Sequence, residues 1–138
     1  MARMSEKSIG FIGAGNMAEA MIRGLLRGEF KPEQVSASGP REERMTELSD
    51  KFGIHATTDN HVPAGADIVV LSVKPQILSR VLDEVAGSIS AEALVISIAA
   101  GIPVAAIQSR LAAGTRVVRA MPNTPALVDA AAKTRRSR

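Results

Sequence analysis

The chain of 138 residues contains no cysteine, tryptophan or tyrosine, and it has only two histidines. Without cysteine it can form neither a disulfide framework nor a thiol nucleophile. His55 and His61 are too few to form a Cys/His metal cluster, so we expect no metal site. Neither histidine has neighbours that form a recognisable catalytic constellation, and the sequence identifies no catalytic residue.

Aromatic residues are nearly absent, since the chain holds three phenylalanines and no other aromatic side chain. Hydrophobic residues still make up 46% of it, so the core must be built from Val, Ile, Leu, Ala and Met. The formal net charge is +3, and much of the excess lies in residues 133–138. Because no basic face or interleaved aromatics accompany this tail, we predict no nucleic-acid partner.

Long apolar runs are also missing. The chain has no stretch of about 18 apolar residues that could span a membrane, and its N-terminus lacks the long apolar segment of a signal peptide. We therefore expect one cytoplasmic domain of ordinary size with no membrane partner.

The most informative stretch is residues 8–26, where a short apolar run leads through glycines into a helical pattern. Residues 9–12 suit a buried strand, and apolar side chains between Met17 and Leu25 follow a helical period. Strand, glycine turn and helix in this order are the context of a dinucleotide-binding fingerprint. The alternative is a glycine turn that only joins two elements.

Each small residue of this turn has a physical role in such a fingerprint. Gly13 allows a tight turn, Gly15 leaves the backbone open to a pyrophosphate, and Ala18 lets the helix pack close to the strand. The first N–H groups of the helix are unpaired and favour an anion. We therefore predict that these residues of the turn bind a cofactor: Gly13, Ala14, Gly15, Asn16 and Met17.

The second strand, expected at 34–38, is not followed by an acidic residue. An NAD-binding domain usually has Asp or Glu there to bind the ribose hydroxyls, whereas this chain continues Ser38-Gly39-Pro40-Arg41. A hydroxyl, open backbone and an arginine favour the 2′-phosphate of NADP. We predict NADP (NADPH) as the cofactor, with NAD as the alternative. The other interpretation is that Ser38 caps the next helix and Arg41 is solvated.

Two further polar residues follow predicted strands. Asn60 comes after a short strand at 54–57 and could reach the adenosine half of a cofactor, although helix capping explains it equally well. Lys74 directly follows the apolar run 67–73, which is typical of a central parallel strand. Ligands bind at the carboxyl ends of such strands, so we predict Lys74 at the site, with a solvated charge as the alternative.

Strands and helices alternate through the rest of the chain, with further strands expected at 94–98 and 116–121. Six strands alternating with helices predict an α/β fold, a doubly wound and mostly parallel sheet of the Rossmann type. Right-handed crossovers would place the glycine turn, Lys74 and the loops after the last two strands along one edge.

Three segments, in this order and spacing, carry a family resemblance. They are residues 10–18 (GFIGAGNMA), 73–76 (VKPQ) and 121–125 (MPNTP). With Ala99-Ala100-Gly101 between them, residues 6–128 resemble the N-terminal domain of pyrroline-5-carboxylate reductase. The glycine motif is shared by many dehydrogenases, whereas the lysine–proline pair and the MPNTP loop are far more specific.

The resemblance implies the final step of proline biosynthesis, in which NADPH or NADH transfers a hydride to 1-pyrroline-5-carboxylate and gives L-proline. It implies that the adenosine end of the cofactor lies by Ser38, Gly39, Arg41 and Asn60. It implies that the nicotinamide end lies by Val73, Lys74, Pro75, Ala99, Ala100 and Asn123.

The family also has a second, all-helical domain that builds a homo-oligomer and completes the substrate pocket. We expect residues 1–128 to form the NAD(P)-binding domain, 129–138 to be a basic tail unlike the family, and the helical domain to be missing. The chain alone is therefore expected to be inactive. The alternatives are an NADP(H)-binding module without catalysis and a different Rossmann hydride-transfer enzyme.

Overall fold

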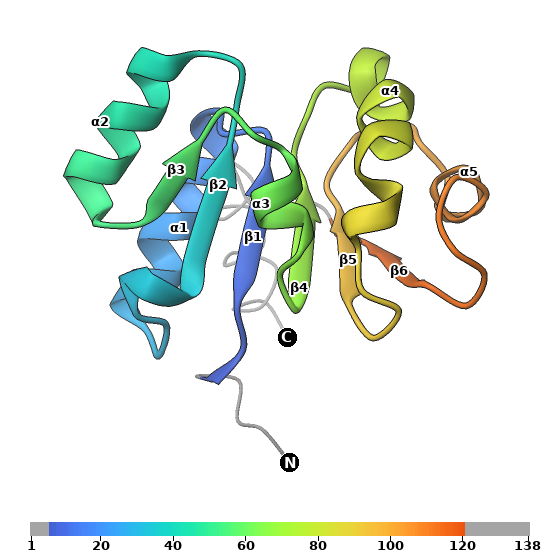
Figure 1. Cartoon of the computed structure of the whole chain (residues 1–138), viewed down its shortest axis with the longest axis horizontal. Helices are drawn as coiled ribbons and strands as arrows, with labels where there is room; N and C mark the ends of the chain where they lie inside the picture. Colours follow the sequence, from blue (N-terminus) through green and yellow to red (C-terminus); the bar gives the residue numbers. More distant parts are fainter. Residues whose placement is uncertain (1–5, 121–138) are drawn as a thin grey trace, which may run out of the picture.

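The computed structural model describes residues 6–120, which form a sheet of six strands with helices on both faces (Figure 1). The strands are β1 (Ile9–Ile12), β2 (Val35–Ser38), β3 (His55–Thr57), β4 (Ile68–Leu71), β5 (Leu94–Ser97) and β6 (Arg116–Arg119). Their order in the sheet is β3-β2-β1-β4-β5-β6, and each neighbouring pair is parallel. The predicted doubly wound sheet is confirmed.

The helices alternate with the strands, as the hydrophobic periods predict. They are α1 (Asn16–Arg27), α2 (Glu42–Phe52), α3 (His61–Ala64), α4 (Pro75–Val85) and α5 (Val104–Gln108), with 3₁₀ turns η2 (Pro32–Gln34) and η3 (Ala86–Ser88). Gly28 and Gly53 end α1 and α2, as glycine often does. The apolar period around α5 extends to Leu111, but the helix ends earlier because the last amides bond three residues back.

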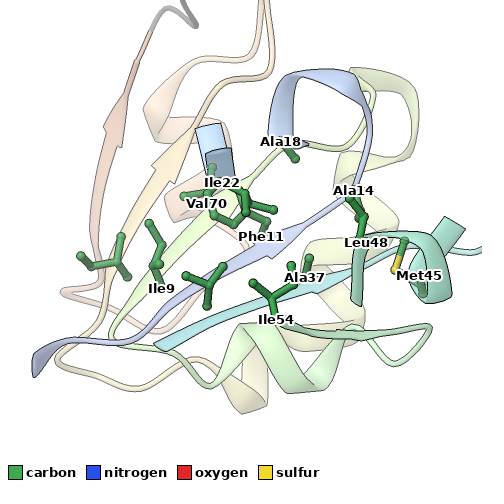
Figure 2. Close-up of a cluster of buried hydrophobic side chains, with 12 residues drawn as sticks. Ile9, Phe11, Ala14, Ala18, Ile22, Ala37, Met45, Leu48, Ile54 and Val70 are labelled. Atoms are coloured by element: carbon green, nitrogen blue, oxygen red, sulfur yellow. The ribbon is translucent and has the colours of Figure 1, made fainter. Parts of the chain in front are cut away.

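Two apolar clusters bury the two faces of the sheet. The first joins β1, β2 and β4 to α1 and α2, and Figure 2 shows Phe11, Ile22 and Val70 grouped within it. The second joins the opposite face to α3, α4 and α5. Central strands read as continuous apolar runs because both of their faces are covered in this way.

The close packing of α3 explains a glycine that sequence patterns leave unmarked. A Cβ on Gly10 of β1 would lie 2.6 Å from the Cα of Pro63 in α3. No side chain fits there, so the glycine lets the short helix lie directly on the strand. Between residues 6 and 120, no helix combines the length and the apolar character needed to cross a membrane.

The strands end in register at the carboxyl edge of the sheet. Ile12 at the end of β1 pairs with Ser38 on one side and with Leu71 on the other, and Leu71 pairs with Ser97. The chain leaves β1 for β2 on one side and returns to β4 on the other. This reversal of strand order creates the crevice where doubly wound sheets bind ligands.

Candidate functional site

A groove with a volume of about 560 Å³ opens at the carboxyl ends of β1 and β4. The turn after β1, the turn after β2 and the turn after β4 all contribute to it. Its lining consists of Gly13, Ala14, Gly15, Asn16, Gly39, Pro40, Arg41, Arg44, Met45, Ser72, Val73, Lys74 and Ile77. The topology therefore brings together most of the residues that the sequence predicts for the glycine turn and the strand ends.

Gly13 makes the tight turn that the fingerprint requires. Its φ of 101° lies in the region that favours glycine, and its amide donates a 2.9 Å hydrogen bond to the carbonyl of Ser38. A Cβ there would come within 2.8 Å of the backbone of Ser72. The hydroxyl of Ser72 in turn donates to the carbonyl oxygens of Gly13 and Ile12, at 2.6 and 3.1 Å. The fold itself therefore needs glycine at position 13.

Gly15 has the opposite surroundings. It is the N-cap residue of α1 in an extended conformation, and a Cβ added there would meet no atom of residues 6–120 within 4 Å, apart from its neighbours in the chain. Among residues 6–120, no side chain caps this end of α1. The helix therefore presents its first N–H groups and the positive end of its dipole to the groove. This open cradle fits a phosphate group.

The other predicted residues of the turn differ in their exposure. Ala14 is buried against the first apolar cluster, and Asn16 is exposed at the start of α1. Met17 is half-buried and lies outside the groove lining. Ala18 is buried in the same cluster, as expected for the small residue that lets helix and strand pack closely.

Ser38 differs from its predicted environment. Its side chain is fully buried, and its hydroxyl donates a 2.7 Å hydrogen bond to the Oδ1 of Asn60 instead of facing the groove. The capping alternative is also wrong, because Arg41 is the N-cap residue of α2 and no described side chain caps that helix. Ser38 thus joins the end of β2 to the segment before α3, and its hydroxyl is not open to a ligand.

Asn60 connects two more parts of the structure. Its Nδ2 donates to Glu84 of α4 at 3.1 Å, and the residue borders a smaller pocket of about 160 Å³ with Gly39 and Arg80. The capping of α3 comes from Asp59, whose Oδ1 accepts a hydrogen bond from the amide of His61 at 3.0 Å. The Asn60 side chain is therefore not the cap.

Arg41 and Gly39 follow β2 on the wall of the groove. Gly39 is buried, and its amide donates to the carbonyl of Thr57 at 3.1 Å. The side chain of Arg41 is 76% exposed, and its guanidinium lies 3.8 Å from the Glu43 carboxylate. A loose ion pair on the surface holds a side chain weakly, so Arg41 is free to turn toward a ligand in the groove.

Lys74 lies on the opposite wall. It is the extended N-cap residue of α4, because the following Pro75 disfavours the helical conformation before it. The side chain is exposed, and Lys74 and Val73 both line the groove, whereas Pro75 does not. Lys74 therefore brings a positive charge to the edge of the groove.

The predicted nicotinamide contacts are only partly described. Ala99 is buried and Ala100 is exposed after β5, and neither lines the groove. Asn123 and the rest of the loop at 121–125 lie outside the described residues, as does the tail at 129–138. Their predicted roles remain predictions.

Sequence reasoning missed an ionic cluster behind the glycine turn. Glu19 of α1 accepts from Lys51 and Arg44 of α2 at 2.8 Å each, and from Arg23 at 3.0 Å. The hydrogen bond from Lys51 and the one from Arg44 hold the pKa of Glu19 at about 2, although its partial burial opposes this. Burial disfavours the charge of Arg44, but the bonds to Glu19 and Glu47 outweigh it and raise its pKa.

The chain is similar in sequence to a known family and to curated proteins. Residues 8–101 match the family described as NADP oxidoreductase, coenzyme F420-dependent. The chain is 47% identical over 131 residues to a pyrroline-5-carboxylate reductase of Methanosarcina acetivorans, an alignment that covers 94% of this chain and 48% of that protein. The chain thus spans about half the length of the curated relatives it matches.

Solved structures agree with these sequence similarities. A pyrroline-5-carboxylate reductase from Coxiella burnetii superposes with a TM-score of 0.81 at 38% identity, covering 88% of this chain and 46% of that one. A pyrroline carboxylate reductase from Plasmodium falciparum, solved with NADP bound, gives a TM-score of 0.76 at 29% identity over 91% of this chain and 46% of that one. The resemblance found in the three sequence segments is confirmed.

Proposed function

The chain belongs to the family described as NADP oxidoreductase, coenzyme F420-dependent, and from this premise we propose that its groove binds NADP(H). The observation that carries the proposal is the open N-terminus of α1 at Gly15, where a Cβ would meet no described atom beyond its chain neighbours within 4 Å. An anion that enters this space gains unpaired amides and the helix dipole. The turn therefore has the chemistry to hold a diphosphate.

The remaining parts of the cofactor are assigned to the two walls. We propose that the adenosine half lies on the β2 side, near Gly39, Arg41 and Asn60, and the nicotinamide half on the β4 side. The residues proposed for the nicotinamide half are Val73, Lys74, Pro75, Ala99, Ala100 and Asn123. This assignment is supported by the switch-point topology and by Gly39, Arg41, Val73 and Lys74, which line the groove. The other residues are proposed from the family resemblance.

NADP is proposed in preference to NAD. No carboxylate lies at the end of β2, since Ser38 stands there with its hydroxyl bonded to Asn60. A 2′-phosphate on the ribose would therefore meet no buried negative charge, and Arg41 is exposed on the same wall. Because Ser38 is satisfied internally, Arg41 is the group we propose for the 2′-phosphate.

The finer proposal is that the chain is the cofactor-binding part of a pyrroline-5-carboxylate reductase. The relatives carry that name, and the substrate of the reaction would be 1-pyrroline-5-carboxylate and its product L-proline. The bound cofactor would supply the hydride. The residues of this chain would bind and orient it, and residues from outside 1–138 would complete the substrate pocket, so the chain alone would bind without turnover.

Calorimetric titration tests the binding proposal. The purified chain should bind NADPH and should bind nicotinamide mononucleotide, which lacks the diphosphate bridge, far more weakly. The same sample should then be assayed for NADPH oxidation with 1-pyrroline-5-carboxylate. Binding without turnover supports a cofactor module, and turnover would show that the chain suffices as a reductase. If neither NADPH nor NADH bound at millimolar concentration, the proposal would be wrong.

A further inference from the structure

Arg44 of α2 lines the groove and contacts the glycine turn from the side of α2. Its Nε donates a 3.1 Å hydrogen bond to the carbonyl oxygen of Ala14, and one of its terminal nitrogens donates to the carbonyl oxygen of Gly15 at 3.4 Å. The two residues of the turn lie about 30 positions away in sequence. A single guanidinium therefore bonds to two consecutive peptide groups of the turn.

The bond to Ala14 holds the Ala14–Gly15 peptide, and the bond to Gly15 adds to the one that the Glu19 amide donates to the same oxygen at 3.0 Å. In a trans peptide the C=O and the following N–H point in opposite directions. Holding the oxygens of Ala14 and Gly15 toward α2 therefore directs the N–H groups of Gly15 and Asn16 away from it. Both of those residues line the groove. The planar fork of arginine is suited to such paired contacts, which the single ammonium of lysine could not reproduce.

The charge of Arg44 is already matched within the protein. Its other terminal nitrogen lies 2.8 Å from Glu19 and 2.7 Å from Glu47. Glu19 is held at the same time by Lys51 at 2.8 Å. A guanidinium with two carboxylate partners is poorly placed to act as a further cation for a phosphate, so its contribution is geometric.

We propose that Arg44 is a positioning residue that holds the Gly13–Gly15 turn in the shape that binds the diphosphate, without contacting the cofactor. This inference rests on the proposed function of the groove. It goes beyond it by assigning the orientation of the turn to a side chain of α2, held in place by Glu19 of α1.

The test compares Arg44→Gln and Arg44→Lys with the matched control Lys51→Gln, which removes a partner of Glu19 but no contact with the turn. Affinities for NADPH and NADH are measured for each, together with melting temperatures and the amide resonances of Gly15 and Asn16. Arg44→Gln should weaken both cofactors by the same factor, about tenfold for two lost hydrogen bonds. Arg44→Lys should recover little of this loss, and Lys51→Gln should keep wild-type affinity.

The amide resonances separate positioning from a merely structural role. In the absence of ligand, the signals of Gly15 and Asn16 should shift in both Arg44 variants and stay in place in Lys51→Gln. A loss confined to NADPH would mean that Arg44 binds the 2′-phosphate itself, and equal affinity in all variants would show that it only supports the fold. If Arg44→Gln does not fold, Arg44→Lys, which keeps the charge beside Glu19, decides between these outcomes.

The two proposals can fail separately. If the wild-type chain binds no nucleotide, the proposed function fails, while the ligand-free amide shifts still report whether Arg44 orients the turn. If the wild-type chain binds and the Arg44 variants bind equally well with unmoved amide signals, only the inference about Arg44 is overturned.

Discussion

Gly13 and Gly15 stand two positions apart in one turn, yet the structure needs them for different reasons. A Cβ at Gly13 would lie within 2.8 Å of the backbone of Ser72, and its φ is 101°. Within the part of the chain that the structure describes, a Cβ at Gly15 would meet no atom within 4 Å beyond its chain neighbours, and its backbone is extended. The first glycine is a requirement of the fold. The second has no such requirement, and the space beside it points to a ligand.

The comparison teaches how to separate folding from binding within one motif. A fingerprint with two glycines looks uniform in sequence, but only the surroundings of each Cβ position show which one the chain needs for itself. Substitutions at the two positions should therefore change two different measurements, stability at Gly13 and affinity at Gly15.

The largest expected effect is on stability. Gly13→Ala forces a side chain into left-handed backbone and against Ser72, and we expect a loss of about 3 kcal/mol in the free energy of unfolding. Urea unfolding measures it. Gly24→Ala is the matched control, because a Cβ on Gly24 in α1 meets nothing within 4 Å. It should not destabilise the chain, and an equally stable Gly13→Ala would contradict the comparison.

Gly15→Val should change binding and leave the fold intact. The branched side chain occupies the space proposed for the diphosphate. We therefore expect the affinity for NADPH to fall at least about a hundredfold, which corresponds to about 2–3 kcal/mol of binding free energy. Titration calorimetry and a melting curve on the same sample measure both properties. Gly24→Val controls for a valine on α1. Undiminished NADPH binding in Gly15→Val would separate the groove from the cofactor site.

Arg41→Ala tests binding on the β2 side of the groove, away from the two glycines. We expect NADPH affinity to fall about tenfold, the scale of one charge-assisted contact, with little change for NADH. Equal losses for the two cofactors would remove the reason for preferring NADP. Arg27→Ala is a useful control, since Arg27 lies in the last turn of α1 and lines neither the main groove nor the smaller pocket.

The smallest effect concerns the ionic cluster that supports the turn. Since the pKa of Glu19 falls from 4.5 to about 2 on folding, its ionised form stabilises the folded chain above pH 4.5. This stability is lost as the pH falls toward 2. Glu19→Gln should cost about 1 kcal/mol at pH 7, allowing for solvent screening, and progressively less as the pH falls to 2 and below. Unfolding curves at both pH values measure the difference, and a cost independent of pH would argue against the ion pairs as its source.

Most of the sheet could be predicted because the signals for it are local. Apolar runs such as 68–71 and helical periods such as that of α4 report burial directly. Parallel strands then fix which ends share an edge, so the predicted gathering of Gly15, Lys74 and the β2 end follows from topology.

The contacts that depend on distant partners could not be predicted. Ser38 is polar enough in sequence to face a ligand, but its acceptor Asn60 lies 22 positions away and becomes adjacent only in the folded sheet. The contacts of Arg44 were unpredictable for the same reason, since Ala14 and Gly15 lie about 30 positions away in the sequence. Charged residues at the start of a helix usually face solvent, and no local pattern marks this one as turned inward.

The hydrogen bonds of Ser72 hold the shape of the crevice in the absence of a ligand. One hydroxyl links the turn after β4 to the carbonyl oxygens of Ile12 and Gly13, and the amide of Gly13 joins the turn after β1 to Ser38 at the end of β2. These bonds set the spacing of the β2 and β4 walls before anything enters. A ligand that matches this spacing would bind without a free-energy cost for rearranging the protein. A wider ligand would have to break the two hydrogen bonds of Ser72 to fit.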